Sequence, residues 1–209
     1  MVTLPMFPLG MVVFPGSRFT LRVFEGRYLE LVEDCVDNEL GFGVSLIAKG
    51  HEVGGGDERY EYGTLSRIVE IANIGAGKLM ISCVGEKRFR VLEWIAENPY
   101  PMATIEFEEV KDIEDIESNQ IDELKNILSR TADTVSELSG FRRQVQMGAG
   151  PEPTDQIYYL AENSYLGAYD KYQVLAAKSL KERFNLLSEL LTEVDEMYEA
   201  ELALRNQSD

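Results

Sequence analysis

The sequence predicts an α+β fold in which an antiparallel β-barrel with one capping helix is followed by a bundle of helices. Strand patterns joined by short glycine-rich turns fill the first half, and a helical period fills the second half. With 209 residues, 44% of them hydrophobic, the chain is long enough to bury a substantial core. We predict two regions, a barrel over 1–116 and a helical region over 117–209, with the change of composition in the acidic stretch 106–117.

The extended segments of the first half alternate or are uniformly apolar. In RFTLRVFE (18–25), Phe19, Leu21 and Val23 recur at every second position, which is typical of a half-buried strand. The other expected strands span 41–48, 62–74, 78–85, 87–97 and 102–110. Because short turns such as IGAG (74–77) join them, we expect an antiparallel sheet that curls into a barrel.

One amphipathic helix is expected among these strands, in GRYLELVEDCVDN (26–38). Its apolar residues fall at i, i+3, i+4, i+7 and i+8, on one face, and its acidic residues lie on the other. The apolar residues are Tyr28, Leu31, Val32, Cys35 and Val36. This helix is predicted to cap one end of the barrel.

The second half carries a helical period throughout. We expect one helix over about 119–139, two short tyrosine-rich helices within 154–177, and a last helix opened by a Ser179-x-x-Glu182 capping box. The last helix has a stripe formed by Leu180, Phe184, Leu187, Leu191, Val194 and Tyr198. A stripe this short is typical of an intramolecular core, with a coiled coil between two chains as the alternative.

Charge and cysteine content exclude several classes of partner. Acidic residues outnumber basic ones 37 to 20, a formal net charge of −17. Such a surface repels phosphate groups, so we expect no binding to nucleic acid or to an anionic membrane. Cys35 and Cys83 lie in apolar runs and are expected to be buried and reduced, as in a cytoplasmic protein. Neither a signal peptide nor a transmembrane helix is predicted.

No set of catalytic or metal-binding residues is recognised. His51, the single histidine, lies in a glycine-rich loop, which is a poor platform for a catalytic base. GAGKL (75–79) lacks two residues of a phosphate-binding loop, so a hairpin turn is predicted there. The acidic run 106–117 lacks the spacing of a calcium loop and is interpreted as a solvated linker, with weak cation binding as the alternative. We expect no enzymatic activity, cofactor or bound metal.

Several segments, taken in order, resemble the N-terminal domain of the Lon protease family. They are FPL (7–9), the FPG turn (14–16), GTLSRI (63–68) and GEKRFR (85–90). The C-terminal stretch YDKYQVLAAKSLKERFNLLSELL (169–191) is similar to the terminal helices of that domain. Together they cover most of the chain, and their order and spacing make the resemblance specific.

The resemblance implies a six-stranded barrel of the PUA-like kind, a helical bundle beside it and a non-catalytic role in contacting unfolded or tagged polypeptide. The family's ATPase and Ser-Lys protease modules are not recognised in these residues, so proteolysis is not carried over. PUA-like folds often bind RNA, but a net charge of −17 argues against RNA here. The predicted function is binding of unfolded or extended polypeptide, as a substrate adaptor for proteolysis or quality control, with a protease or ATPase as partner.

We predict that the polypeptide lies in a groove between barrel and bundle, lined by aromatic side chains. The candidates are Phe24, Tyr28, Tyr158, Tyr159, Tyr165, Tyr169 and Tyr172. The alternative for each of them is a place in the core. Two other functions stay open: a small-molecule receptor or carboxylate-dependent enzyme with its site in the same groove, and a structural homodimer through the C-terminal helix.

Overall fold

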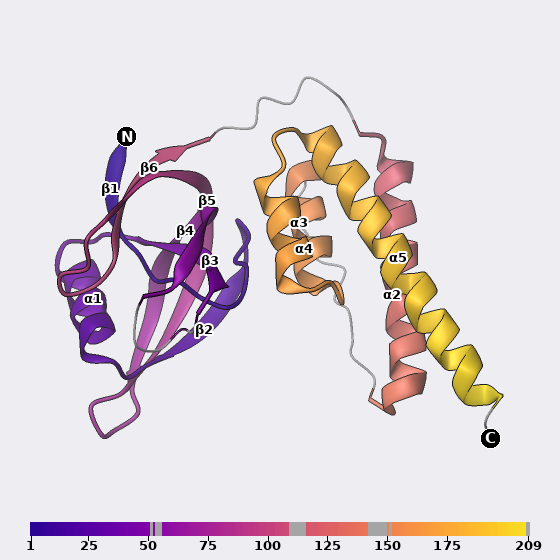
Figure 1. Cartoon of the computed structure of the whole chain (residues 1–209), viewed down its shortest axis with the longest axis horizontal. Coiled ribbons are helices and arrows are strands. Elements are labelled where there is room, and N and C mark those ends of the chain that lie inside the picture. Colours follow the sequence, from indigo (N-terminus) through magenta and orange to yellow (C-terminus); the bar gives the residue numbers. More distant parts are fainter. Residues whose placement is uncertain (51, 53–55, 109–115, 142–149, 151, 208–209) are drawn as a thin grey trace. The chain divides into compact units, whose positions relative to one another are not determined.

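The chain divides into two compact units, Met1–Glu109 (unit 1) and Val110–Asp209 (unit 2), and each is described by itself. The computed structural model describes every residue except 51, 53–55, 109–115, 142–149, 151 and 208–209. Unit 1 contains the strands and one helix, and the described part of unit 2 contains helices (Figure 1). The predicted α+β fold is confirmed.

Unit 1 is a six-stranded antiparallel sheet. Its strands are β1 (Val2–Pro5), β2 (Arg18–Val23), β3 (Phe42–Lys49), β4 (Glu58–Asn73), β5 (Leu79–Ile95) and β6 (Met102–Phe107). They are hydrogen-bonded in the order β1-β6-β5-β4-β3, and β2 pairs with the first part of β5. Two strands predicted over 78–85 and 87–97 are one strand, β5. The Gly-Glu pair that resembles a turn there is a bulge, in which Ser66 pairs with Gly85 and Leu65 with Lys87.

The sheet closes into a barrel through residues that follow β1. The amide of Phe7 donates to the carbonyl of Gly43 at 2.8 Å. The amide of Leu9 donates to the carbonyl of Ser45, and the carbonyl of Leu9 accepts from Ile47, both at 2.9 Å. These parallel bridges join the two ends of the strand order. Closure pairs backbone groups that an open sheet would leave at its edges.

The Phe-Pro-Gly stretch forms the predicted tight turn and is fixed to β5. Ser17 N donates to Phe14 O at 3.1 Å, and Gly16 adopts φ +86°, a conformation that side chains disfavour. Gly16 N donates to Gly85 O at 2.8 Å, and Gly85 N donates to Ser17 O at 2.9 Å. A Cβ on Gly85 would lie 2.4 Å from Phe14 O, so only glycine lets the turn approach β5 this closely.

The GTLSRI stretch meets the same turn from β4. Thr64 Oγ1 donates to the carbonyl of Val13 at 2.6 Å, and Thr64 is fully buried. Three of the segments that carry the family resemblance, at 14–16, 63–68 and 85–90, therefore contact one another in the barrel wall.

Helix α1 (Gly26–Asp37) packs its apolar face on the larger of the two cores of unit 1. Tyr28, Leu31, Val32 and Cys35 are buried there, as predicted, among the inward side chains of β2 and β5. Val36 differs from the prediction: it is 51% exposed and lines a hollow next to β4.

A second core lies around Phe89. Its ring is fully buried and packs where β3 and β4 carry glycine: a Cβ on Gly63 would lie 2.6 Å from Phe89 Cζ and 2.2 Å from Val44 O. The other buried members of this core are Leu4, Met6, Val91, Ala103 and Ile105. Tight backbone approach at glycine is thus what makes room for the large ring.

Unit 2 is built from α2 (Ser118–Ser139), α3 (Pro153–Asn163), α4 (Ala168–Ala176) and α5 (Leu180–Asn206). These agree with the predicted helices. The Ser179 side chain caps α5 by accepting from Glu182 N at 3.1 Å. The Glu182 carboxylate accepts from Lys178 N at 2.8 Å, so the reciprocal half of the predicted capping box forms one residue earlier. A full capping box forms instead at α2, between Glu117 and Gln120.

Helices α2 and α5 run alongside each other within unit 2 (Figure 1). Leu187 and Leu191 of the predicted stripe are buried inside the unit. Two charged residues are buried with them, and sequence reasoning did not anticipate either. Asp195 is 2% exposed and accepts from Arg130 Nε and from Thr131 Oγ1, each at 2.7 Å.

Arg183, the other buried charge of unit 2, is fully enclosed. Its Nη2 donates to the carbonyl of Ala177 at 2.8 Å, and its guanidinium lies 5.1 Å from the centre of the Tyr158 ring. A planar, delocalised cation can be buried against an aromatic face in this way. Arg183 therefore holds the α4–α5 connection against α3.

Candidate functional site

The predicted aromatic residues of unit 1 have opposite environments. Tyr28 is 3% exposed, and its ring stacks on Phe7 with 4.0 Å between centroids. Burial is the main cause that raises the pKa of its hydroxyl to about 12. Phe24 is 50% exposed. Tyr28 thus belongs to the core, and Phe24 is available for contact.

The predicted aromatic residues of unit 2 differ in exposure in the same way. Tyr158 and Tyr172 are buried, Tyr159 and Tyr165 are partly buried, and Tyr169 is 53% exposed. The structure brings Tyr169 together with Tyr172 as a stacked pair, with 6.3 Å between ring centroids.

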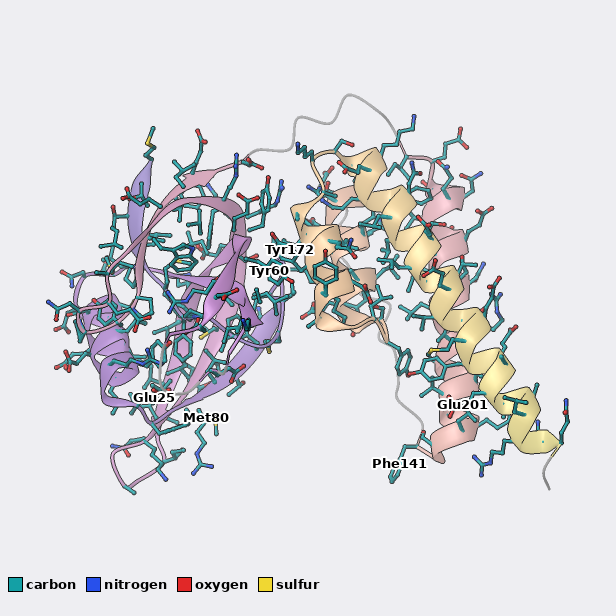
Figure 2. All side chains as sticks on the ribbon, viewed as in Figure 1. Glu25, Tyr60, Met80, Phe141, Tyr172 and Glu201 are labelled. Atoms are coloured by element: carbon teal, nitrogen blue, oxygen red, sulfur yellow. The ribbon has the colours of Figure 1, made fainter. Side chains whose placement is uncertain are left out.

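Tyr165 meets Tyr198 of α5 edge to face, at 5.9 Å between ring centroids. Phe141, which the sequence did not single out, is 82% exposed and extends away from the end of α2 (Figure 2). The role of the seven predicted residues in binding stays a prediction, as does the groove between barrel and bundle.

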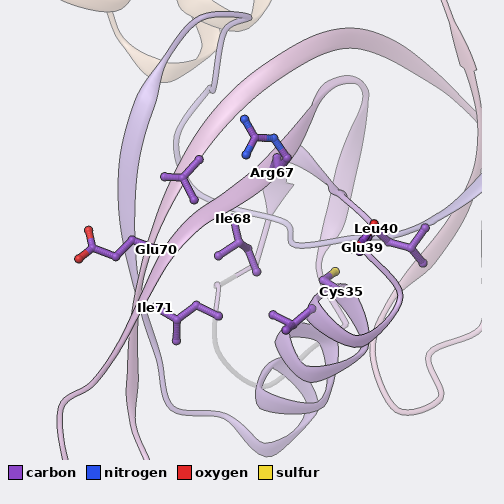
Figure 3. Close-up of a pocket in the computed structure, with 9 residues that line it drawn as sticks. Cys35, Glu39, Leu40, Arg67, Ile68, Glu70 and Ile71 are labelled. Carbon is purple, nitrogen blue, oxygen red and sulfur yellow. The ribbon is translucent and has the colours of Figure 1, made fainter.

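Sequence reasoning missed a hollow within unit 1, between α1 and β4, which we call the α1–β4 groove (Figure 3). It has a volume of about 520 Å³ and is lined by Cys35, Val36, Glu39, Leu40 and residues 67–71. A second hollow of about 370 Å³ shares Val36 and Ile71 with it and continues toward the β4–β5 turn. Together they form one depression along the outer half of β4.

The α1–β4 groove exists because β4 is longer than its neighbour β3. Pairing between these strands ends at Phe42 opposite Ser66, while β4 continues to Asn73 along β5. The chain that precedes β3 turns away toward the end of α1, so Leu40 and the residues of β4 lie on opposite sides of the hollow (Figure 3).

Apolar side chains gather in this groove. Val36, Leu40, Val69 and Ile71 are 51%, 48%, 44% and 41% exposed, although all four are large and hydrophobic. Single exposed apolar residues are common, but a group around one hollow indicates a surface that binds something. The signal available in the sequence was a run of apolar residues in IVEIANI (68–74) that does not alternate.

The walls of the groove are mainly acidic. Glu39 lines the groove itself, and Glu33 and Asp37 line its continuation. Glu70 belongs to the β4 edge of the groove, with its carboxylate directed away from α1 (Figure 3). Arg67 is the basic residue among the lining residues described, and its Nε donates to Glu86 at 2.8 Å. The site therefore favours apolar and positively charged groups over anions.

Covalent chemistry is not supported by the grouping of side chains at this site. Burial, and then the charge of Asp34, raises the pKa of the Cys35 thiol to about 12, so the nucleophilic thiolate is scarce at neutral pH. The described residues contain no group of three His, Cys, Asp or Glu side chains placed to hold a metal ion. His51 and most of the acidic run 106–117 lie outside the described residues.

Each of two enclosed carboxylates, one in each unit, is paired with an arginine side chain. In unit 1 the Asp57 side chain accepts from Arg59, as Asp195 accepts from Arg130 in unit 2. Burial is the largest single influence on the pKa of Asp57 and would raise it, but the hydrogen bonds from Arg59, a backbone hydrogen bond and the charges of Arg59 and Arg27 together lower that pKa. In the described part of the chain, no helix is long and apolar enough to span a membrane.

Comparison with known proteins identifies the family. The model of the ATP-dependent protease La (LON) substrate-binding domain matches residues 3–193. The chain belongs to the LON substrate-binding domain family. A Lon protease of Anaeromyxobacter dehalogenans is 30% identical over 193 residues, which cover 90% of this chain and 23% of that protein. Lon protease 2 of Myxococcus xanthus is 29% identical with the same coverage.

Solved structures agree with this LON-domain assignment. The Lon N-terminal domain protein from Xanthomonas campestris superposes with a TM-score of 0.66 at 28% identity, over 90% of this chain and 98% of that one. The N-terminal domain of Mycobacterium avium complex Lon protease gives a TM-score of 0.59 at 15% identity, which shows the shared fold. The predicted PUA-like barrel followed by helices is thereby confirmed. The chain spans about a quarter of the length of the curated Lon proteases it matches.

Proposed function

We propose that this LON-domain protein binds unfolded or extended polypeptide in the α1–β4 groove, without catalysing a reaction on it. One observation carries the proposal: four exposed apolar side chains surround a hollow in a chain of the LON substrate-binding family. Unfolded chains expose the apolar side chains that such a hollow would cover, whereas folded proteins bury theirs. The acidic walls add a preference for basic segments.

We further propose that the bound polypeptide is passed to a protease or ATPase partner, so that the protein acts as a substrate adaptor. Support comes from the similarity to Lon proteases, of which this chain matches one part. In this proposal the two exposed aromatic residues among the predicted seven, Phe24 and Tyr169, are secondary contacts.

A pair of isoleucines in unit 1 provides a matched test. Ile71, in the groove, is 41% exposed, and Ile95, at the end of β5 and absent from the lining of the groove, is 40% exposed. The probe is fluorescein-labelled lysozyme that has been reduced and then blocked with iodoacetamide, so that it stays unfolded. Native lysozyme is the control, because it is also positively charged and would bind if attraction between opposite charges were sufficient.

We expect fluorescence anisotropy to show binding of the unfolded probe and not of native lysozyme. Ile71→Ser should weaken binding about tenfold, the loss of roughly one buried apolar side chain, and Ile95→Ser should leave it unchanged. Equal binding of native and unfolded lysozyme, or equal effects of the two substitutions, would refute the proposal. The same assay with Phe24→Ser and Tyr169→Ser tests the secondary contacts.

The adaptor role needs a separate measurement. A Lon protease should degrade the labelled unfolded lysozyme faster in the presence of the wild-type protein than in the presence of the Ile71→Ser variant. An identical rate with both proteins would remove the adaptor role and leave polypeptide binding intact.

A further inference from the structure

One edge of β4 is open beside the α1–β4 groove. Residues 67–73 pair with β5 on one side, from Arg67 opposite Val84 to Asn73 opposite Leu79. On the other side, where β3 pairs with the first half of β4, no described residue of unit 1 forms a backbone hydrogen bond with 67–73. Backbone donors and acceptors along this edge are therefore available to another strand.

The open place is the one that a longer β3 would occupy. At Gly41 the chain still lies against β4, since a Cβ there would be 2.9 Å from Ser66 O. Before Gly41 the chain diverges, and Leu40 and Glu39 form the far wall of the groove. Neighbouring strands in a sheet lie about 4.8 Å apart, and the hollow of about 520 Å³ begins at that edge.

A β-bulge limits which strands fit. Ile68 pairs with Cys83 and Glu70 with Ser82, so Val69 is an extra residue in β4. Bulges at an edge discourage pairing with the long, flat edge of another copy. Past the bulge the pairing is regular again from Glu70 to Asn73, which leaves a short edge suited to a short extended segment.

The two faces of an added strand would have different surroundings. Ile68 and Ile71 share a face with buried Cys83 and Ile81, the face toward α1. Glu70 lies on the opposite face, pointing away from α1 (Figure 3). Paired residues on neighbouring strands share a face, so an added strand is favoured when apolar residues alternate with basic ones.

We propose that the open edge of β4 takes up an extended polypeptide segment as an additional strand, with apolar side chains in the α1–β4 groove and alternating Lys or Arg side chains toward Glu70. Backbone hydrogen bonds would then provide binding for many sequences, and the alternation would provide the preference. This inference rests on the proposed function, because it specifies how the groove binds polypeptide.

The test uses an eight-residue peptide, acetylated and carrying fluorescein, in which Lys and Val alternate. Two further versions carry N-methyl groups on all four Val residues or on all four Lys residues. A strand at an edge uses the amides of alternate residues only, so one methylated version should lose binding at least tenfold and the other should bind within about twofold of the parent. A peptide with Glu in place of Lys should not bind.

The outcomes separate this inference from the function on which it depends. Equal binding of both methylated peptides would overturn the added strand, as would binding of unfolded lysozyme with none of the alternating peptide. Failure of both the peptide and unfolded lysozyme to bind would instead refute the proposed function. Light scattering that shows a dimer, together with its dissociation by Ile71→Glu, would overturn the inference by assigning the edge to a second copy. Ile71→Ser should weaken the parent peptide, and Ile95→Ser should not.

Discussion

The two units are stabilised by different kinds of contact. In unit 1, backbones approach closely at glycines: Gly85 lets the Phe-Pro-Gly turn reach β5, and Gly63 accommodates Phe89. In unit 2, helices pack through side chains, and two charged residues, Arg183 and Asp195, are buried among them. The packing of unit 1 therefore depends on particular residues at particular positions, whereas the packing of unit 2 depends mainly on the helical spacing of its apolar residues. Most of the segments with a recognisable family resemblance lie in unit 1 for this reason.

The largest expected effect is on the rate at which the thiols are chemically modified. This rate reports on unit 1 alone, because Cys35 and Cys83 are the only cysteines and both lie in unit 1. Burial raises the pKa of each thiol from 9.0 to about 12. Iodoacetamide at pH 8 should therefore modify the native protein roughly a thousandfold more slowly than the protein in urea, because each pKa unit is a factor of ten. Mass spectrometry gives the rates. Fast modification of either thiol in the native protein would contradict its burial.

The same pKa shift gives unit 1 a pH dependence. Below about pH 9 both thiols are neutral in the folded and in the unfolded chain, so their ionisation does not affect the free energy of unfolding. Between about pH 9 and pH 12 only the unfolded thiols ionise, and the stability of unit 1 falls. Cys83→Ala should reduce this alkaline loss without changing the behaviour near pH 7 beyond a constant offset.

The next effect tests the dependence on glycine. Gly63→Ala places a methyl group 2.2 Å from the Val44 carbonyl, a rigid backbone atom, and should cost about 3 kcal/mol of the free energy of unfolding. Urea unfolding followed by the fluorescence of Trp94, the single tryptophan, reports on unit 1. Gly26→Ala is the control, because its Cβ meets nothing within 4 Å. Equal free energies of unfolding for the two variants would contradict the claim that unit 1 depends on close backbone approach at glycine.

A smaller effect is expected from the buried carboxylate of unit 2. Arg130→Ala removes the cation that pairs with the enclosed Asp195 carboxylate and leaves the hydrogen bond from the Thr131 hydroxyl, so it should cost about 2 kcal/mol of the free energy of unfolding. Lys125→Ala is the control: Lys125 also pairs with an acid, Asp122 at 2.8 Å, but the Asp122 carboxylate is exposed to solvent, unlike that of Asp195. That change should cost less than about 0.5 kcal/mol. Circular dichroism at 222 nm during urea unfolding measures both, and a small loss in Arg130→Ala would show that the charge is solvated.

The smallest effect concerns a helix end in unit 2. Ser179→Ala removes the oxygen that accepts from Glu182 N and should cost about 1 kcal/mol. Ser118, the first residue of α2, is the matched control, since Glu117 caps that helix. Thermal unfolding should show a lower midpoint for Ser179→Ala than for Ser118→Ala. Equal midpoints would mean that the capping hydrogen bond contributes nothing measurable.

Local patterns predicted the elements well where one face of an element is buried. The stripe of Tyr28, Leu31 and Cys35 gave α1, and alternation at Phe19, Leu21 and Val23 gave β2. Patterns failed where a local signal has two structural meanings. The Gly85-Glu86 pair resembles a turn but is a bulge inside one long strand, because pairing with β4 continues through it.

The α1–β4 groove could not be predicted in the same way. Val36 belongs to the apolar stripe of α1, but it is exposed beside the part of β4 that β3 does not pair with. Pairing between β3 and β4 stops at Ser66 although β4 continues to Asn73, and no local pattern in the sequence indicates this difference in length. The burial of Asp195 and Arg183 was not predicted for a similar reason. Asp195 pairs with Arg130, 65 residues away in the chain, and the Arg183 guanidinium packs on the ring of Tyr158 in α3.

By itself the sequence determined the strands and helices, the kind of fold and the family, because these depend on periodicity and on short motifs whose residues act locally. Only the tertiary structure decided which apolar residues stay exposed and where a strand keeps a free edge. Those properties depend on how far each strand pairs with its neighbours, and that length is set by contacts between residues distant in the chain.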